Sequence, residues 1–158
     1  INTKMRRILL LAFIAIAAIC STAQAGTAIT QAQLPKEARN FISKYFSADK
    51  VRKVEKDMGH RGMEYEVDFI SGAEVDFRED GNWKEVKAAR GRAVPTAIVP
   101  AAISQYVKAK YAGQSIVKIS LKRGGYEIKL SGGVELQLTK DAKPYSSQGN
   151  RQGNRKRK

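Results

Sequence analysis

The sequence predicts an α+β fold made of two tandem units, each a helix packed on an antiparallel meander of three to four strands. Each half opens with a helical apolar stripe and continues with stretches of apolar–polar alternation separated by glycine-containing turns. The pattern of residues 26–90 returns over 91–141, at an offset of 65 residues and later of 61. The 158 residues suffice for one ordinary domain or two very small ones, which excludes a large multidomain enzyme.

The first 25 residues have the pattern of an export signal. A basic stretch at 4–7 precedes an uninterrupted apolar run at 8–19, and Ala-Gln-Ala at 23–25 suits signal peptidase, so we expect cleavage after Ala25. A membrane anchor is one alternative, but twelve helical residues rise only about 18 Å against a hydrocarbon core of about 30 Å. A lipid-modified Cys20 is another, although isoleucine stands where that signal needs a small residue. The sequence therefore predicts a periplasmic or secreted protein without an integral membrane segment.

Each unit is expected to begin with a helix. Apolar residues recur at helical spacing from Leu34 in the first unit and from Val99 in the second, and Pro35 and Pro100 suit the first helical turn. We interpret these stripes as core rather than as a cofactor-binding surface. They comprise Leu34, Ala38, Phe41, Ile42, Tyr45 and Phe46 in the first unit, and Val99, Ile103, Tyr106, Val107 and Tyr111 in the second.

Antiparallel strands follow each helix. The first strand of each unit is expected near 51–58 and 116–122, and a fourth strand near 83–86 completes the first unit. The second unit has Pro144 where the first has Trp83, which leaves its fourth strand open because proline cannot donate to a central ladder. Hairpin turns are expected at Ser71-Gly72, Asp80-Gly81-Asn82, Gly124-Gly125 and Gly132-Gly133. The strand residues expected to face the helices are Tyr65, Val67, Phe69, Val75, Phe77, Tyr126, Ile128, Leu130, Leu136 and Leu138.

Several short motifs stand in a characteristic order along the chain: Leu34-Pro35, Phe41-Ile42, Tyr65-Glu66-Val67, the Gly72 turn, Glu74-Val75-Asp76-Phe77, Asp80-Gly81-Asn82-Trp83 and Val99-Pro100. Their order resembles the PepSY-like family of secreted bacterial proteins, which are described as beta-lactamase-inhibitor-like. The resemblance covers roughly residues 34–141 and implies tandem units similar to the two halves of beta-lactamase inhibitory protein, with a solvated sheet face available to a protein partner.

No constellation of catalytic, cofactor-binding or metal-binding residues is apparent, so we expect a protein that is not an enzyme. His60 is the single histidine and lies in a glycine-flanked loop, where it lacks the partners that a base or a metal ligand needs. After signal cleavage the chain would hold no cysteine, which excludes disulfides and thiol catalysis. A calcium loop with spacing such as D-x-D-x-D-G is absent. The serines Ser71, Ser104, Ser115 and Ser120 have no activating pattern around them.

The candidate binding surface is the polar face of the predicted sheet. Strand alternation places carboxylates of neighbouring strands side by side, where they repel each other unless a cation compensates them. That face would bind a cation or a basic partner; the alternative is an ordinary solvated face neutralised by neighbours such as Lys53, Arg78 and Lys84. The candidate residues are Glu64, Glu66, Asp68, Glu74, Asp76, Arg78, Glu127, Lys129, Glu135 and Gln137.

Two segments outside the predicted folded region contribute to the net charge of +14. Removal of the signal lowers it to +11, because residues 1–25 carry three basic residues and no acidic one. Residues 142–158 carry six basic residues and no acidic one, and we expect them to form a disordered tail. The tail either keeps the protein soluble or contacts anionic envelope polymers or lipid head groups. Nucleic acid is not expected as a partner of an exported protein. The basic contacts would be Arg151, Arg155, Lys156, Arg157 and Lys158.

Three classes of function therefore compete. The sequence favours an exported noncatalytic binding module that acts, in an inhibitory or another role, on an envelope or extracellular protein through its solvated sheet face. The alternative is a polymer- or lipid-binding protein that acts through its basic tail. An envelope enzyme is the third class, and the sequence supports it least.

Overall fold

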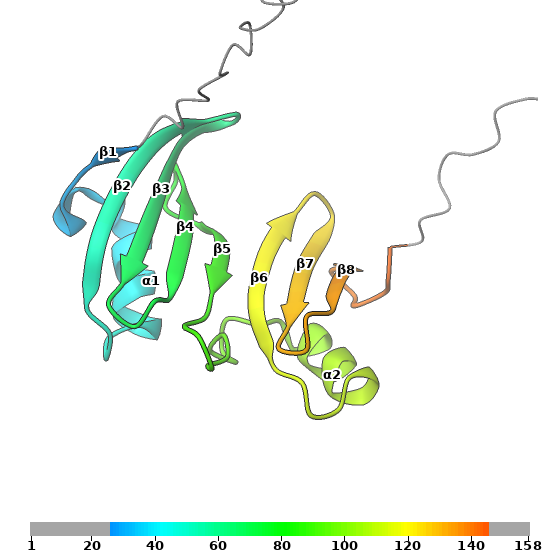
Figure 1. Cartoon of the computed structure of the whole chain (residues 1–158). Helices are drawn as coiled ribbons and strands as arrows, with labels where there is room; N and C mark the ends of the chain where they lie inside the picture. The colour runs from blue at the N-terminus through cyan, green and yellow to red at the C-terminus, as the bar shows by residue number, and fades with distance from the viewer. Residues whose placement is uncertain (1–25, 146–158) are drawn as a thin grey trace, which may run out of the picture.

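The computed structural model of the chain describes residues 26–145. They form one eight-stranded antiparallel sheet in which each strand pairs with its neighbours in sequence, from β1 to β8 (Figure 1). This arrangement confirms the predicted α+β class. The expected signal peptide and residues 146–158 of the expected tail lie outside the described residues. The strands are β1 (Thr27–Ala28), β2 (Val51–Gly59), β3 (Gly62–Phe69), β4 (Glu74–Arg78), β5 (Trp83–Lys87), β6 (Ile116–Lys122), β7 (Gly125–Leu130) and β8 (Glu135–Thr139).

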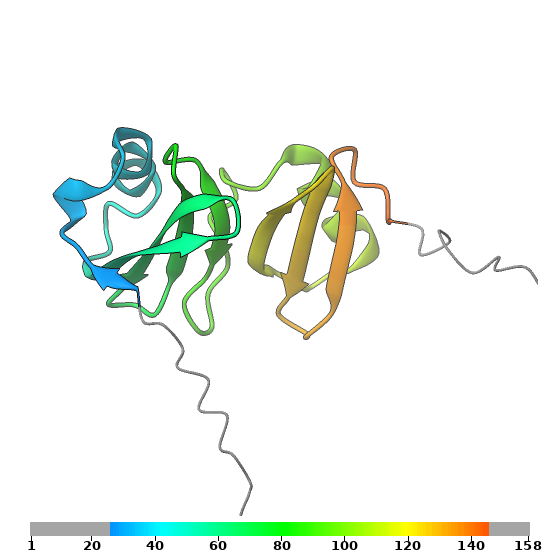
Figure 2. The same ribbon diagram turned by 90° about the horizontal axis from the view of Figure 1, so that it is seen from above.

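Two α-helices flank the strands. Helix α1 (Lys36–Tyr45) follows the short 3₁₀ helix η1 (Gln31–Gln33), and α2 (Ala101–Lys110) lies between β5 and β6. Figure 1 shows α1 behind β2–β4, and Figure 2 shows the two helix–strand groups side by side. Neither helix of the described region is long and apolar enough to cross a membrane.

The prolines lie one position earlier than the first-turn position expected from the sequence. Pro35 and Pro100 are the N-cap residues, with φ of −51° and −55° and extended ψ. An N-cap residue contributes its carbonyl to the helix but not its N–H, and the carbonyl of Pro35 accepts the N–H of Arg39 at 3.1 Å. Proline therefore starts each helix without losing a hydrogen bond.

The core is built on a continuous apolar row that crosses seven strands. In each antiparallel pair the residues of this row lie directly opposite one another, and both helices pack against the same buried cluster. Because side chains of a strand alternate between faces, the next residue along each strand points to the other side of the sheet. The apolar row consists of Val54, Val67, Val75, Val86, Ile119, Ile128 and Leu136.

The β5–β6 pairing joins the two helix–strand groups. It comprises three opposite pairs, centred on Val86 and Ile119, both fully buried. The segment after β5 extends the contact, because Ala88 and Val94 donate their N–H groups to the carbonyls of Val117 and Ile116, both at 2.8 Å. The sheet is thereby continuous through a short joint.

Residues 142–145, which the sequence analysis placed in the basic tail, fold back along β8. Lys143 accepts the N–H of Thr139 at 2.8 Å, and Pro144 forms a bridge with Leu138. Tyr145 donates its N–H to the carbonyl of Gln137 at 3.0 Å. Pro144 is tolerated here because the bridge lies at the edge of the sheet, where one missing donor breaks no ladder between two strands. The sheet therefore ends, after β8, in an isolated bridge instead of the fourth strand that the sequence left open for the second half.

Loss of a buried aromatic ring should strongly destabilise the protein. Phe77 is fully buried and meets Phe41 edge to face at 5.5 Å between ring centroids, while Phe69 stacks on Phe46 at 4.6 Å. We expect Phe77→Ala or Phe69→Ala to lower the free energy of unfolding by about 3–5 kcal/mol, as measured by urea denaturation. Arg78→Ala, on the exposed position next to Phe77, is the control and should cost less than about 0.5 kcal/mol. Equal costs for Phe77→Ala and Arg78→Ala would contradict the described core.

The turn between β4 and β5 holds α1 close to the sheet. Gly81 has φ of +81°, and a Cβ there would lie 2.8 Å from Cβ of Pro35 and 3.0 Å from the nitrogen of Ala38. Gly72 has a similar φ of +90° but no heavy atom within 4 Å of such a Cβ. Gly72→Ala should therefore cost only the left-handed backbone penalty of about 1–2 kcal/mol, and Gly81→Ala should cost clearly more in the same urea measurement. If the two costs are the same, the close contact between turn and helix is wrong.

Candidate functional site

A row of seven polar side chains crosses the outer face of the sheet, opposite the helices. Register places Glu55 of β2 opposite Glu66 of β3, Glu66 opposite Asp76 of β4, and Asp76 opposite Glu85 of β5. The same register continues through β6 and β7 to Gln137 on β8. The row contains five carboxylates and no basic residue. We call the following residues the polar row: Glu55, Glu66, Asp76, Glu85, Ser120, Glu127 and Gln137.

A second row on the same face has charges of both signs. It lies two residues away along each strand and is nearly balanced, with four lysines and three carboxylates. We call it the mixed row: Lys53, Asp68, Glu74, Lys87, Lys118, Lys129 and Glu135.

The structure places all ten sequence-derived candidate residues on this face. Four belong to the polar row and four to the mixed row, while Glu64 and Arg78 lie opposite each other on the remaining side of the polar row. Glu55 and Glu85 were not among the candidates predicted from the sequence, although extending the alternation through β2 and β5 would have included them. It treated Ser120 only as a nucleophile without activation. The polar-row candidates are Glu66, Asp76, Glu127 and Gln137, and the mixed-row candidates are Asp68, Glu74, Lys129 and Glu135.

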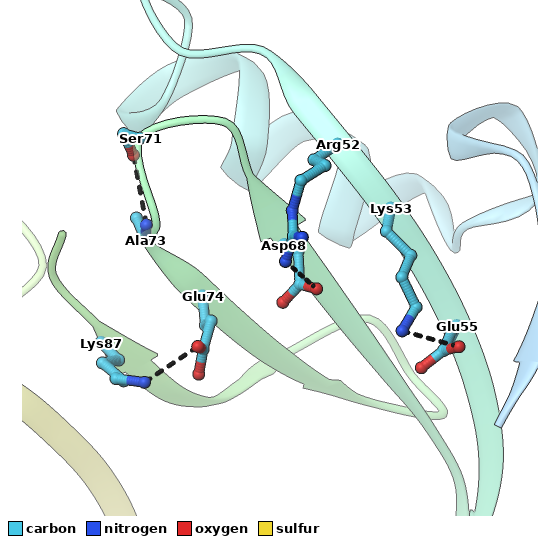
Figure 3. A network of polar contacts seen from close by, with 8 residues as sticks. All are labelled: Arg52, Lys53, Glu55, Asp68, Ser71, Ala73, Glu74 and Lys87. Atoms are coloured by element: carbon cyan, nitrogen blue, oxygen red, sulfur yellow. Dashed lines mark hydrogen bonds and ion pairs between the residues drawn. The ribbon is translucent and has the colours of Figure 1, made fainter. Parts of the chain in front are cut away.

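Most carboxylates around the first part of the polar row have a cationic partner. Of the three neutralising residues expected from the sequence, Lys84 pairs with a candidate carboxylate, Glu64, at 2.6 Å, whereas Lys53 pairs at 2.9 Å with Glu55, which was not a candidate. Arg78, the third, takes part in no ion pair among residues 26–145. Figure 3 shows the ion pairs of Asp68 and Glu74 together with the pair Lys53–Glu55. Asp68 pairs with Arg52 at 2.8 Å and Glu74 with Lys87 at 2.8 Å, and farther along the mixed row Lys129 pairs with Glu135 at 3.2 Å.

A polar cluster spans the β5–β6 joint. Glu85 receives a hydrogen bond from the hydroxyl of Ser120 at 2.7 Å and forms an ion pair with Lys118 at 2.7 Å. Burial acts to raise the pKa of Glu85, but the hydrogen bonds from Lys118 and Ser120 outweigh it and lower the pKa. The hydrogen bond to Glu85 in turn raises the pKa of Lys118. Glu85 is therefore a satisfied carboxylate, and buried Ser120 is its donor.

Glu66 and Asp76, which lie between Glu55 and Glu85 in the polar row, lack this compensation. Within the described residues neither carboxylate has an ion-pair partner within 4 Å. Burial, followed by the charges of Asp68 and Glu74, raises the pKa of Glu66. Burial, followed by the charges of Glu85 and Glu66, raises the pKa of Asp76 from 3.8 to about 6, and the more distant Lys84 offsets this only in part. The ionised form of Asp76 is thus disfavoured at the place where carboxylates are densest.

These two carboxylates line a hollow of about 280 Å³ on the outer face. Glu55, Asp57 and Glu64 contribute three further carboxylates to its wall. They are spread along strands β2 and β3 rather than converging on one point, and residues 26–145 contain no group of three or more His, Cys, Asp or Glu side chains that could hold a metal ion. The hollow is therefore better suited to a long cationic side chain than to a metal cage.

His60 lies where the sequence analysis expected it. It is exposed in the turn between β2 and β3, outside the hollow. The serines considered as nucleophiles lie apart from it: Ser71 follows β3, Ser104 is in α2, Ser115 precedes β6, and buried Ser120 is bonded to Glu85. The described residues therefore do not bring a histidine and a serine together.

Comparison with solved structures places the fold among periplasmic proteins. The chain is similar to a "putative calcium-regulated periplasmic protein" from Bacteroides thetaiotaomicron, with 35% identity and a TM-score of 0.71 over 76% of this chain and 94% of that one. It is also similar to a "putative periplasmic protein" from Bacteroides vulgatus, with 32% identity and a TM-score of 0.73 over 78% and 97%. A second Bacteroides vulgatus protein, described as of unknown function, shares 34% identity with a TM-score of 0.68 over 73% and 91%.

None of these descriptions names an enzymatic activity. No curated protein matches the chain. The family model described as "Putative beta-lactamase-inhibitor-like, PepSY-like" matches two overlapping regions, residues 20–69 and 63–143, which together include the whole sheet. The identity with the solved structures and this match agree, and the chain belongs to the PepSY-like family.

Proposed function

We propose that the protein is an exported, noncatalytic binding module that uses the outer sheet face to hold a basic surface of an envelope or extracellular protein. The observation that carries the proposal is the pair Glu66 and Asp76, two neighbouring carboxylates on a hollow without an ion-pair partner among the described residues. A cationic side chain placed there would remove the repulsion that raises the pKa of both groups. The candidate residues on β7 and β8 would extend the contact area.

Export and the tandem arrangement are part of this proposal. Export is supported by the signal-like residues 1–25 and by the periplasmic description of the similar structures. Two units, at 26–90 and 91–141, are supported by local features that recur at the offsets found in the sequence. The β2–β3 and β6–β7 pairings shift register at Val51/Lys53 and at Ile116/Lys118 respectively. The corresponding turn bonds are Phe69 N–H to Ala73 O at 2.9 Å and Leu130 N–H to Val134 O at 2.8 Å.

Calcium is a second candidate ligand, because one of the similar proteins is described as calcium-regulated. The spread of the carboxylates around the hollow favours a protein partner over this ion. The two are separated by titrating calcium chloride alone into the purified protein and measuring heat. Saturable binding in the micromolar range that Asp76→Asn removes would assign the hollow to calcium instead.

Charge reversal on the hollow should abolish partner capture. Immobilised protein is exposed to envelope extract, and proteins retained by wild type but not by Glu66→Lys or Asp76→Lys are quantified. Because like charges would then meet at the interface, we expect a loss of about tenfold or more in retention. Glu37→Lys and Glu79→Lys, exposed and outside both rows, make the same charge change and should retain the partner.

The same capture distinguishes the alternative functions. Unchanged retention and melting temperature in both row variants would show that the face is only a solvated surface. Retention that disappears when Ser146–Lys158 is removed, and that salt abolishes, would assign binding to the basic tail and to anionic polymers. Turnover of an envelope substrate that His60→Ala abolishes would favour an enzyme.

The repulsion at Asp76 should also be visible as a pH-dependent cost in stability. The pKa of Asp76 is about 6 in the folded chain against an ordinary value of 3.8, which we take for the unfolded chain. Between these pH values the folded chain holds the proton more tightly than the unfolded chain does. The ionisation of Asp76 therefore lowers the free energy of unfolding as the pH rises through 6. We expect Asp76→Asn to be more stable than wild type by about 1–3 kcal/mol at pH 7, and this difference to vanish near pH 4. Urea denaturation of both proteins at each pH measures it. A difference that does not depend on pH would contradict the assignment, and Glu37→Gln serves as the control.

A further inference from the structure

We propose that the basic C-terminal segment of the chain, residues 146–158, lies across the polar row of its own sheet and supplies the cations that Glu66 and Asp76 lack. The inference concerns the face used in the proposed function and assigns it an internal competitor. It requires no partner protein, so it can be tested on the purified chain alone.

Charge complementarity is the first argument. Residues 146–158 contain five basic residues and no acidic one, whereas the polar row contains five carboxylates and no basic residue. Of those carboxylates, Glu55, Glu85 and Glu127 have lysine partners at 2.9, 2.7 and 3.7 Å. Glu66 on β3 and Asp76 on β4 are therefore the two carboxylates of the polar row without an ion-pair partner among residues 26–145.

The point at which the described chain ends is the second argument. Tyr145 donates its N–H to the carbonyl of Gln137, the last member of the polar row, so the segment begins in line with that row. The hydroxyl of Tyr145 donates to the carbonyl of Arg123 at 3.1 Å. This contact ties the end of the described chain to the β6–β7 turn and fixes the starting point of the segment.

The length of the segment is the third argument. Neighbouring strands lie about 4.8 Å apart, so the path from Tyr145 along the row crosses about 24 Å to Asp76 and about 29 Å to Glu66. An extended chain covers at most about 3.3–3.6 Å per residue, which carries Arg151 to about 20 Å and Arg155 to about 35 Å from Tyr145. Arg151, with its long side chain, can thus reach Asp76, and Arg155 can reach Glu66 with slack.

Docking of this kind would regulate the face. The segment and a basic partner would neutralise the same two carboxylates, so the partner must displace the segment. Because the contacts are ion pairs near solvent, docking is weak and sensitive to salt, which leaves it reversible. The segment would protect the charged hollow until a partner with better complementarity arrives.

A paramagnetic label on the segment tests the proposal. The chain carrying Cys20→Ser and Gly153→Cys is exported, purified, enriched in ¹⁵N and spin-labelled at position 153. At about 0.01 M salt, where the Debye length is about 30 Å, we expect the amide signals of β3, β4 and β5 to lose intensity. At about 1 M salt, where the Debye length is about 3 Å, the intensity should return.

Three further measurements decide the outcome. Glu66→Gln combined with Asp76→Asn should abolish the loss of signal, whereas Glu37→Gln combined with Glu79→Gln, with the same change in charge, should preserve it. No loss in the parent chain at low salt, or a loss that survives the row substitutions, overturns the proposal. Spin-labelled ¹⁴N protein mixed with unlabelled ¹⁵N protein should show no loss; a loss there would mean that the segment of another copy docks, which also overturns it. The proposed function is untouched by these outcomes, because its capture experiment needs only the face and the partner.

Discussion

The cross-strand register of the sheet is the constraint on which the rest of the structure depends. It aligns Val54, Val67, Val75 and Val86 into the apolar row that the helices cover, and the next residues along these strands are then forced into a row of carboxylates. A slip of one residue would bury the carboxylates and expose the valines. Burying an unpaired carboxylate costs far more free energy than exposing a valine side chain to water, so the packing of the core fixes the register. The concentration of negative charge on the outer face is thus a consequence of how the core is built.

The carboxylate at the β5–β6 joint and those on β3 and β4 differ in how their negative charge is compensated. On the joint itself, Lys118 and Ser120 satisfy Glu85, and the interaction connects residues 35 positions apart in sequence. Away from it, the lysines near Glu66 and Asp76 are already paired with other carboxylates, as Lys53 is with Glu55 and Lys84 with Glu64. Lys53 and Lys84 are therefore used by Glu55 and Glu64, and Glu66 and Asp76 remain without an ion-pair partner among residues 26–145.

The sequence alone was sufficient for α1, α2 and β2 to β8 and for the faces of β3 and β4, because helical stripes, strict alternation and glycine turns are local signals, but it did not predict the short β1 and η1. It was not sufficient for the row as a whole. Whether Glu85 lies beside Asp76 depends on a register shift in the β4–β5 pairing, and whether Ser120 lies beside Glu85 depends on a pairing across α2. The sequence also did not predict which cation pairs with which carboxylate. Arg78 lies opposite Glu64, but Lys84 forms the ion pair with Glu64. These outcomes depend on rotamers and on competition among neighbours, which sequence spacing does not encode.

Protonation and cation binding compete at Asp76, and this competition sets the conditions under which the face can act. A cation that binds beside Asp76 favours its ionised form, so binding must lower the pKa from about 6 toward the ordinary value. By linkage, acidification through that pH range must weaken the same binding, whether the cation belongs to a partner or to the C-terminal segment. Exposed ion pairs elsewhere on the face contribute only about 0–1 kcal/mol each. Selectivity for a cation should therefore come from the half-buried hollow around Asp76 rather than from the total charge of the sheet.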